Sequence, residues 1–250
     1  MTANFEVRKL TTPQDLFQAA AEEVIQAVQE SVKERGRFTI ALSGGSTPRG
    51  LYTLIASNAS TALPWDRMFF FFGDERHVSP DSPESNFRMA NESLLSKVSI
   101  PSKNIFRIPS ENFDAEAAAR EYEKTLRDFF GTAAKQCPRF DLVLLGLGPD
   151  GHTASLFPQT PALREESRLV IANWVEKLKT YRITLTLPVI NATRRVVFLV
   201  SGTDKAAALH EVLEGTEPGE KYPSKLVHPK EGKLIWFVDR AAASELSAAA

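Results

Sequence analysis

The chain has 250 residues, of which 43% are hydrophobic and 24% charged, so it can bury a core of ordinary size and is not a disordered polypeptide. Its formal net charge of −1 argues against a protein that holds nucleic acid or an anionic membrane by bulk electrostatics. The one cysteine, Cys137, cannot form an intramolecular disulfide, and the sequence shows neither a signal peptide nor a membrane-spanning run. We therefore expect a cytoplasmic protein.

Helical and strand-like patterns alternate from end to end, which predicts one α/β domain over residues 1–250. Its core is expected to be a mostly parallel, twisted sheet with helices on both faces. Apolar residues recur at helical spacing from 14 to 35, and Gly36 ends that helix. Further helices are expected from about 48, at 87–98 and 115–130, and after 204 and 239. Strands are expected at 38–45, 68–72, 140–148, 169–172, 181–187, 196–200 and 234–238.

The first glycine loop, SGGSTP, lies between a buried strand and a helix. Backbone amides and hydroxyls at a helix N-terminus can converge on an anion such as a phosphate. A tight turn with a helix cap explains the local spacing equally well. The residues concerned are Ser43, Gly44, Gly45, Ser46 and Thr47.

A second loop, GDERH, places two acids, an arginine and a histidine where the strand at 68–72 ends. Ligands commonly bind at such strand ends in open α/β sheets. Arg76 can pair with a phosphate or carboxylate, while Asp74 and Glu75 can orient hydroxyls or hold Arg76. His77 is expected to be a surface or packing residue.

The third loop, GPDGH, is the most informative, because Asp150 stands two residues before His152 in a glycine loop after a buried strand. A neutral imidazole can take a proton from water, and a nearby carboxylate can fix its tautomer. The alternative is a histidine that packs or caps at a helix start. No metal-ligand spacing such as HExxH or CxxC is present, so no metal site is predicted.

Two sets of later side chains are less specific. Lys179, Arg182 and Lys205 can each reach a phosphate, although most lysines and arginines are simply solvated. The aromatic side chains of the late strands are predicted to be core. These are Trp174, Phe198, Trp236 and Phe237.

Taken together, the motifs resemble those of the 6-phosphogluconolactonase family, whose members share a sheet architecture with the glucosamine-6-phosphate isomerase/deaminase group. The resemblance spans nearly the whole chain. It rests on LSGGSTP at 42–48, GDERHV at 73–78, SNFRMANESLL at 85–95, LGLGPDGHTASLFP at 145–158, RITLTLPVIN at 182–191 and SGTDKA at 201–206.

The resemblance implies a Rossmann-like fold of the glucosamine-6-phosphate deaminase/isomerase type and hydrolysis of a sugar-phosphate lactone without a cofactor. It implies that His152 activates water and that Asp150 supports it. It further implies that residues 43–47, with Asp74, Arg76, Arg182 and Lys205, hold the substrate. The expected partner is the small molecule alone, with no nucleic acid or membrane. The oligomeric state stays open.

Two other functions fit the same motifs. An amino-sugar phosphate isomerase/deaminase would use an acid at 74 or 75 to abstract a carbon-bound proton. A sugar-phosphate sensor would bind through the same loops without turnover, but it usually carries an added DNA-binding or partner-binding region that this chain lacks.

Overall fold

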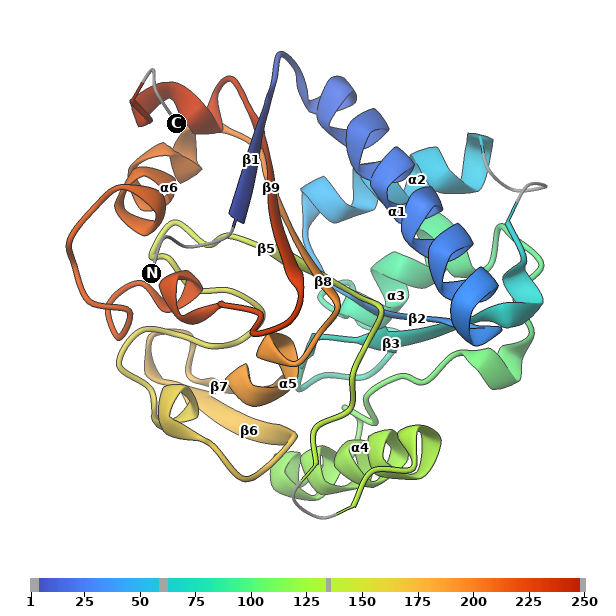
Figure 1. Ribbon diagram of the computed structural model, residues 1–250. Helices are drawn as coiled ribbons and strands as arrows, with labels where there is room; N and C mark the ends of the chain where they lie inside the picture. The colour runs from blue at the N-terminus through green and yellow to red at the C-terminus, as the bar shows by residue number, and fades with distance from the viewer. Residues whose placement is uncertain (1–4, 59–62, 134–135, 248–250) are drawn as a thin grey trace.

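The computed structural model describes residues 5–58, 63–133 and 136–247. Its centre is a six-stranded parallel sheet with strand order β1, β9, β8, β5, β2, β3 (Figure 1). Its strands are β1 (Phe5–Leu10), β2 (Phe38–Leu42), β3 (Met68–Phe72), β5 (Leu142–Gly146), β8 (Arg195–Val200) and β9 (Lys233–Asp239). Every residue of β2 and β8 is buried, as is typical of strands covered on both faces. The predicted parallel α/β sheet is confirmed.

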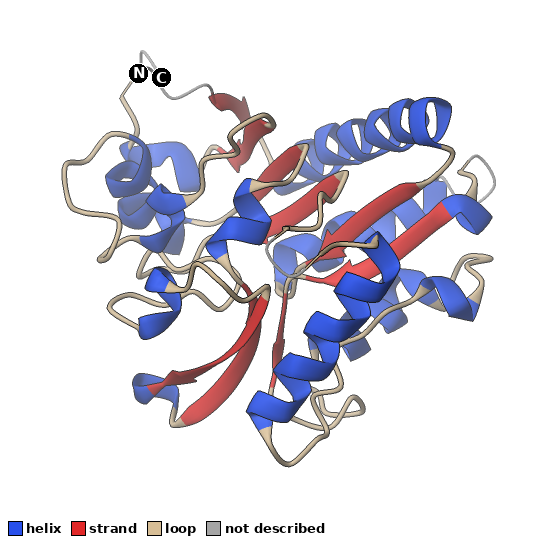
Figure 2. Cartoon of the chain, turned by 60° about the horizontal axis from the view of Figure 1, so that its bottom comes forward, coloured by secondary structure: helices blue, strands red, loops and turns tan. Residues whose placement is uncertain are grey.

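A second sheet is smaller and antiparallel, with the strand order β4, β7, β6. Its strands are β4 (Asp74–Arg76), β6 (Val170–Val175) and β7 (Thr180–Leu185). Strands β6 and β7 were both expected from the sequence, but they pair with each other outside the main sheet, as Figure 2 shows. The reason is the short connection from 176 to 179, because a parallel crossover needs a dozen or more residues.

The helices largely follow their sequence signals. Helix α1 (Pro13–Arg35) begins with a capping box between Thr12 and Asp15 and ends at Gly36, which has a left-handed φ of 73°. Figure 1 shows α1 and α2 (Ser46–Asn58) on one side of β2 and β3 and α4 (Ala115–Phe130) on the other. The remaining α-helices are α3 (Asn86–Ala90), α5 (Leu187–Asn191) and α6 (Ala206–Leu213).

Two helical predictions need correction. The helix expected at 87–98 is α3 followed by a π-helical turn, η2 (Asn91–Leu95), and it ends early. There the Ser96 hydroxyl donates to the Asn91 carbonyl at 2.7 Å, which competes with helix continuation. The helix expected after 239 is only a 3₁₀ turn. The 3₁₀ turns are Trp65–Arg67, Ser102–Asn104, Pro161–Arg164, Glu176–Leu178, Thr203–Lys205, Pro223–Leu226 and Ala242–Glu245.

Most of the predicted aromatic core is confirmed. Phe198 and Trp236 stack with ring centroids 3.7 Å apart, and both are buried, as is Phe237. The prediction is wrong for Trp174, which is 42% exposed. It lies on the hairpin of β6 and β7, where alternate side chains face solvent. None of the described helices is long and apolar enough to cross a membrane.

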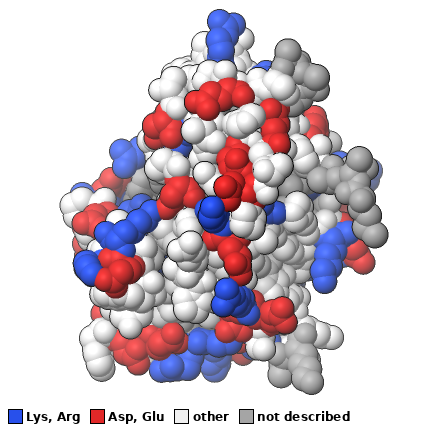
Figure 3. Space-filling model, turned by 90° about the vertical axis from the view of Figure 1, so that its left-hand side faces the viewer, with Lys and Arg blue, Asp and Glu red and all other residues white. Residues whose placement is uncertain are grey.

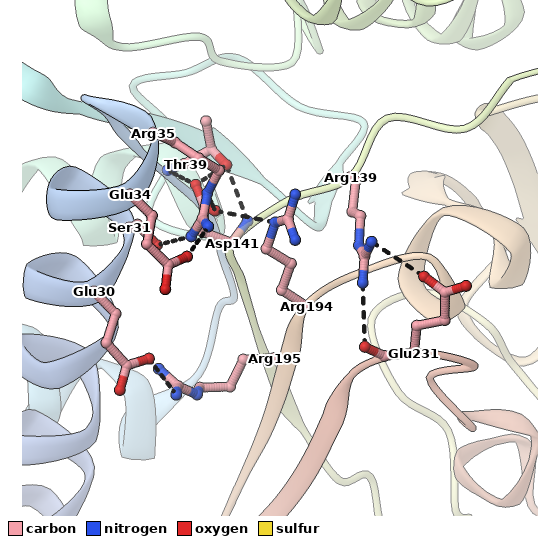
Figure 4. A network of polar contacts seen from close by, with 10 residues as sticks. All are labelled: Glu30, Ser31, Glu34, Arg35, Thr39, Arg139, Asp141, Arg194, Arg195 and Glu231. Carbon is pink, nitrogen blue, oxygen red and sulfur yellow. Dashed lines mark hydrogen bonds and ion pairs between the residues drawn. The ribbon is translucent and has the colours of Figure 1, made fainter.

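A polar network closes the amino end of the main sheet (Figure 4). Asp141, which is 6% exposed, accepts hydrogen bonds from the Thr39 amide and hydroxyl, both at 2.8 Å. Arg35 Nε donates to the same carboxylate at 3.0 Å. Asp141 therefore ties the end of α1 to the starts of β2 and β5.

Replacing Asp141 with alanine is expected to lower the free energy of unfolding by about 2 kcal/mol, because buried donors lose a charged acceptor. Urea unfolding measures this change. The network lies at the amino end of the strands. Any activity located at the carboxyl end should therefore have an unchanged rate at urea concentrations below the unfolding transition. A decrease in the free energy of unfolding no larger than the experimental error would contradict this role for Asp141.

Candidate functional site

The candidate site lies at the carboxyl ends of four adjacent strands, β8, β5, β2 and β3. After β2 the chain forms β3 as its neighbour on one side, and β5 later becomes its neighbour on the opposite side. The connections therefore reverse direction between β2 and β5. In open α/β sheets this switch point leaves a crevice in which ligands bind. The SGGSTP loop follows β2 and the GPDGH loop follows β5, so both flank the crevice.

A cavity of about 270 Å³ occupies this position, a size suited to one small molecule. It unites side chains from loops that are far apart in sequence. Seven of the predicted site residues line it: Ser43, Gly44, Gly45, Asp74, Arg76, His152 and Lys205. Its other lining residues are Asn86, Gly146, Leu147, Gly148, Pro149 and Ala154. Ser46, Thr47, Asp150 and Arg182 are not among the lining residues.

The SGGSTP loop presents its backbone to the cavity. The Tyr52 hydroxyl accepts from the Ser43 amide and donates to the Ser43 carbonyl, both at 3.0 Å. The Ser43 hydroxyl is buried and has no hydrogen-bond partner among the described residues. Ser46 and Thr47 form the first turn of the 13-residue helix α2, whose positive dipole end therefore faces the loop. This arrangement suits an anion.

Strand β4 separates the two acids of the GDERH motif, because successive side chains point to opposite faces. Asp74 accepts a hydrogen bond from the Ser155 hydroxyl at 2.6 Å and lines the cavity. Glu75 accepts from the backbone amides of Arg76, Asn86 and Phe87 at 2.7–2.8 Å. Burial raises the pKa of the Glu75 carboxyl, an effect that these amides oppose. Glu75 therefore anchors the backbone, and Asp74 alone of the pair faces the cavity.

Two arginines lie directly opposite each other in the antiparallel register of β4 and β7, namely Arg76 and Arg182. Arg76 donates to the Glu84 carbonyl at 2.5 Å. The Arg182 side chain is partly buried and has no hydrogen bond or ion pair with another described residue. Burial and the neighbouring Arg76 charge lower the pKa of the Arg182 guanidinium. Two positive charges without a side-chain ion pair, of which Arg76 lines the cavity, favour an anionic ligand nearby.

Lys205 approaches the cavity from the loop after β8, just before α6. Its ammonium pairs with Asp204 at 2.9 Å. The Lys205 side chain is largely buried at 23% exposure, whereas Asp204 is 68% exposed. The lysine therefore belongs to the site, and its acidic partner lies toward solvent.

The imidazole of His152 is oriented by Asp150. The ring Nδ1 lies 2.5 Å from Asp150 Oδ1, and the other ring nitrogen, Nε2, has no hydrogen-bond partner among the described residues. Phe157 stacks on the ring with centroids 4.1 Å apart. An imidazole held at Nδ1 by a carboxylate keeps Nε2 as the acceptor, which is the form that a general base requires.

Glycines make room for this arrangement. A Cβ at Gly148 would lie 2.0 Å from His152 Nδ1, and one at Gly151 would lie 2.5 Å from the Tyr222 ring. Gly151 also has a positive φ of 76°, which glycine adopts without strain. Its carbonyl accepts from the amide and hydroxyl of Ser224 at 3.0 and 2.9 Å. The segment at 222–224 thus holds the GPDGH loop from behind.

The sequence analysis missed three side chains that support the site. Asn86 lines the cavity and donates to the Asp74 carbonyl at 3.0 Å. Ser155 binds Asp74, and Lys177 pairs with Asp150. Asn86 and Ser155 stand inside recognised motifs, which was a usable signal, but Lys177 lies outside all of them.

The two remaining candidates take other places. His77 Nε2 lies 2.6 Å from the Asn112 carbonyl, and the His77 ring packs against Tyr181, so the expected packing role is confirmed. Lys179 pairs with Glu176 at the tip of the β6–β7 hairpin, outside the cavity. In the described part of the chain, no cluster of three His, Cys, Asp or Glu side chains is placed to hold a metal ion.

The fold and the cavity define a Rossmann-like α/β protein with a cavity at its switch point, the place where ligands bind in such sheets. The chain belongs to the glucosamine-6-phosphate isomerase/6-phosphogluconolactonase family, whose model matches residues 11–236. It is 45% identical to a 6-phosphogluconolactonase of Nostoc sp. over 224 residues, which cover 90% of this chain and 91% of the relative. It is 44% identical to one of Synechocystis sp., with 96% and 98% covered.

Solved structures agree. A 6-phosphogluconolactonase from Trypanosoma cruzi superposes with a TM-score of 0.88 at 31% identity, covering 99% of this chain and 98% of that one. A monomeric glucosamine-6-phosphate deaminase gives a TM-score of 0.79 at 24% identity, covering 96% and 100%. At that identity the second likeness shows the shared fold alone.

Proposed function

We propose that the chain hydrolyses 6-phospho-D-glucono-1,5-lactone to 6-phospho-D-gluconate, the second step of the oxidative pentose phosphate pathway. The observation that carries this proposal is the His152 imidazole, which is held by Asp150 and faces a cavity that a loop suited to an anion also lines. The names of the relatives at 44–45% identity support the same activity.

In the proposed mechanism, His152 Nε2 removes a proton from water as the water oxygen attacks the lactone carbonyl carbon. The resulting oxyanion is stabilised by Arg76 or by backbone amides at the cavity. When the tetrahedral intermediate collapses, the bond from this carbon to the ring oxygen breaks, and the imidazolium returns its proton to that oxygen. Asp150 stabilises the imidazolium between the two transfers.

The phosphate is proposed to bind to the SGGSTP loop together with Arg182 and Lys205. The unpartnered Ser43 hydroxyl, the amino end of α2 and the Arg182 side chain, which forms no ion pair with a described residue, support this assignment. Asp74 is proposed to accept a hydrogen bond from a sugar hydroxyl. Binding the remote phosphate would position the ring for attack.

The decisive assay adds the protein to freshly prepared 6-phosphogluconolactone and follows acid release above the spontaneous rate. We expect clear acceleration. Ammonia release from glucosamine 6-phosphate, without acceleration of lactone hydrolysis, would instead identify a deaminase. Stabilisation by the product with neither activity would identify a sensor.

Replacing Arg182 with glutamine is expected to raise KM for the phosphorylated lactone about tenfold, because one charge-assisted contact is lost. With unphosphorylated gluconolactone the same change should have little effect. Steady-state kinetics on both lactones measure the difference. The control is Arg164→Gln, since Arg164 is 80% exposed and pairs with Glu220 away from the cavity. Equal effects on both lactones would remove Arg182 from the phosphate site.

We further propose that residues 1–250 form one domain that acts in the cytoplasm on this small molecule alone. Ester hydrolysis needs only a water, a base and charge stabilisation, so the proposed chemistry uses no metal or organic cofactor. Figure 3 shows acidic and basic side chains intermingled on one face, which supports a protein that does not engage nucleic acid or membrane there.

A further inference from the structure

Lys177 contacts both groups that hold the His152 ring. It lies in the 3₁₀ turn between β6 and β7, on the smaller sheet. Its ammonium pairs with Asp150 Oδ2, while Asp150 Oδ1 faces the imidazole at 2.5 Å. The same ammonium lies 4.9 Å from the centroid of the Phe157 ring, which stacks on His152. The two sheets therefore meet at the proposed catalytic dyad.

We propose that Lys177 is a positioning residue of the lactonase, which shares the Asp150 carboxylate with His152 and thereby sets the pH range in which the imidazole acts as a base. This inference rests on the proposed function. No motif in the sequence and no role described above for the cavity residues requires Lys177.

The Lys177 charge acts on the imidazole in one direction. A carboxylate that also binds an ammonium stabilises the imidazolium less than a carboxylate that binds the imidazolium alone. The ammonium also repels the imidazolium directly. Both effects favour the neutral imidazole, so the base remains available at lower pH. Loss of the Lys177 charge removes both effects, so the ring would then be protonated already at a higher pH.

The geometry indicates that this pairing is specific. The neighbouring acid, Glu176, is bound by Lys179 and by the Trp174 indole nitrogen, the latter at 2.7 Å, so it does not draw Lys177 away. Burial on its own raises the pKa of the Asp150 carboxyl, but the hydrogen bonds from His152 and Lys177 outweigh it and hold that pKa well below its ordinary value.

The other groups around the imidazole stay unchanged when Lys177 is replaced. Asp74, Arg76 and Lys205 line the cavity that His152 faces, and Tyr222 packs behind the loop at Gly151. Their charges act equally in the wild type and in a Lys177 variant. A shift between the two pH profiles therefore reports on the lysine.

The test compares kcat/KM for 6-phosphogluconolactone as a function of pH in the wild type, Lys177→Met and Lys177→Arg. In Lys177→Met the midpoint of the acidic limb is expected to move up by about half a pH unit or more. Arginine at 177 should restore the wild-type profile, because it keeps the charge. The matched control is Lys124→Met on α4, whose ammonium pairs with Asp128 away from the cavity and which should leave the profile in place.

Three results overturn the inference: a Lys177→Met profile that superposes on the wild type, a uniform loss of rate at all pH values, or a shift that arginine fails to reverse. Lys177→Gln provides a second neutral variant should the methionine variant fold poorly. His152→Ala is run in parallel. If it remains active, the proposed site itself is wrong, whereas an inactive His152→Ala with an unshifted Lys177→Met refutes the role of Lys177 alone.

Discussion

Replacing His152 with alanine is expected to lower kcat for 6-phosphogluconolactone by about a thousandfold, because general-base assistance of this kind contributes on the order of 10²–10⁴. KM should change little, since the residues proposed to hold the phosphate remain in place. The acidic limb of the pH–rate profile should also flatten. Acid release, corrected for spontaneous hydrolysis, measures both effects.

A second histidine provides the control. His77 directly follows β4 but is bound to the Asn112 carbonyl and does not line the cavity. His77→Ala should therefore stay within a few-fold of the wild-type rate, and thermal unfolding of both variants separates stability from catalysis. If His152→Ala retained more than a tenth of the wild-type kcat, another group would have to act as the base.

The main sheet was predictable because its strands are buried on both faces. Such strands appear as unbroken apolar runs, as in 68–72 and 142–145, and glycine and charge follow them. Parallel strands share one carboxyl edge, so the loops that follow them converge whatever their separation in sequence. That rule brought Ser43, Asp74 and His152 to one cavity.

Strand pairing was less predictable. Apolar periodicity reports local burial but does not name the neighbouring strand. The edge strand β1 carries charged residues, Glu6, Arg8 and Lys9, and pairs on one side only, so it gave no clear signal. The antiparallel pairing of β6 and β7 depended on the short connection at 176–179, which the sequence analysis did not weigh.

The side chains that support the site could not be predicted from the sequence for a related reason. Lys177 reaches Asp150 only because the smaller sheet is joined to the main sheet through β4, which follows β3 directly. The opposition of Arg76 and Arg182 likewise follows from the register of β4 and β7. Such contacts between distant elements depend on tertiary packing, whereas the dyad of Asp150 and His152 is local and was visible from spacing alone.

Replacing Gly148 with alanine is expected to lower kcat about a hundredfold while the protein stays folded. The added Cβ would lie 2.0 Å from His152 Nδ1 and 2.8 Å from Asp150 Oδ1, so it must displace the imidazole from its carboxylate. Misplacing a catalytic group by about 1 Å costs on the order of 10² in rate. Gly148 does not have a positive φ, so an alanine there carries no backbone strain. The loss should therefore appear in kcat and leave the unfolding temperature nearly unchanged.

Gly73→Ala is the matched control, because a Cβ there would make only an ordinary contact, 3.5 Å from the Leu42 carbonyl. It adds the same methyl group near the same edge of the sheet but does not touch the dyad. We expect it to keep most of the activity. A Gly148→Ala enzyme as active as Gly73→Ala would mean that the ring position set by Asp150 is not required for turnover. Selective loss in Gly148→Ala would show that catalysis depends on that position, independently of any change to His152 itself.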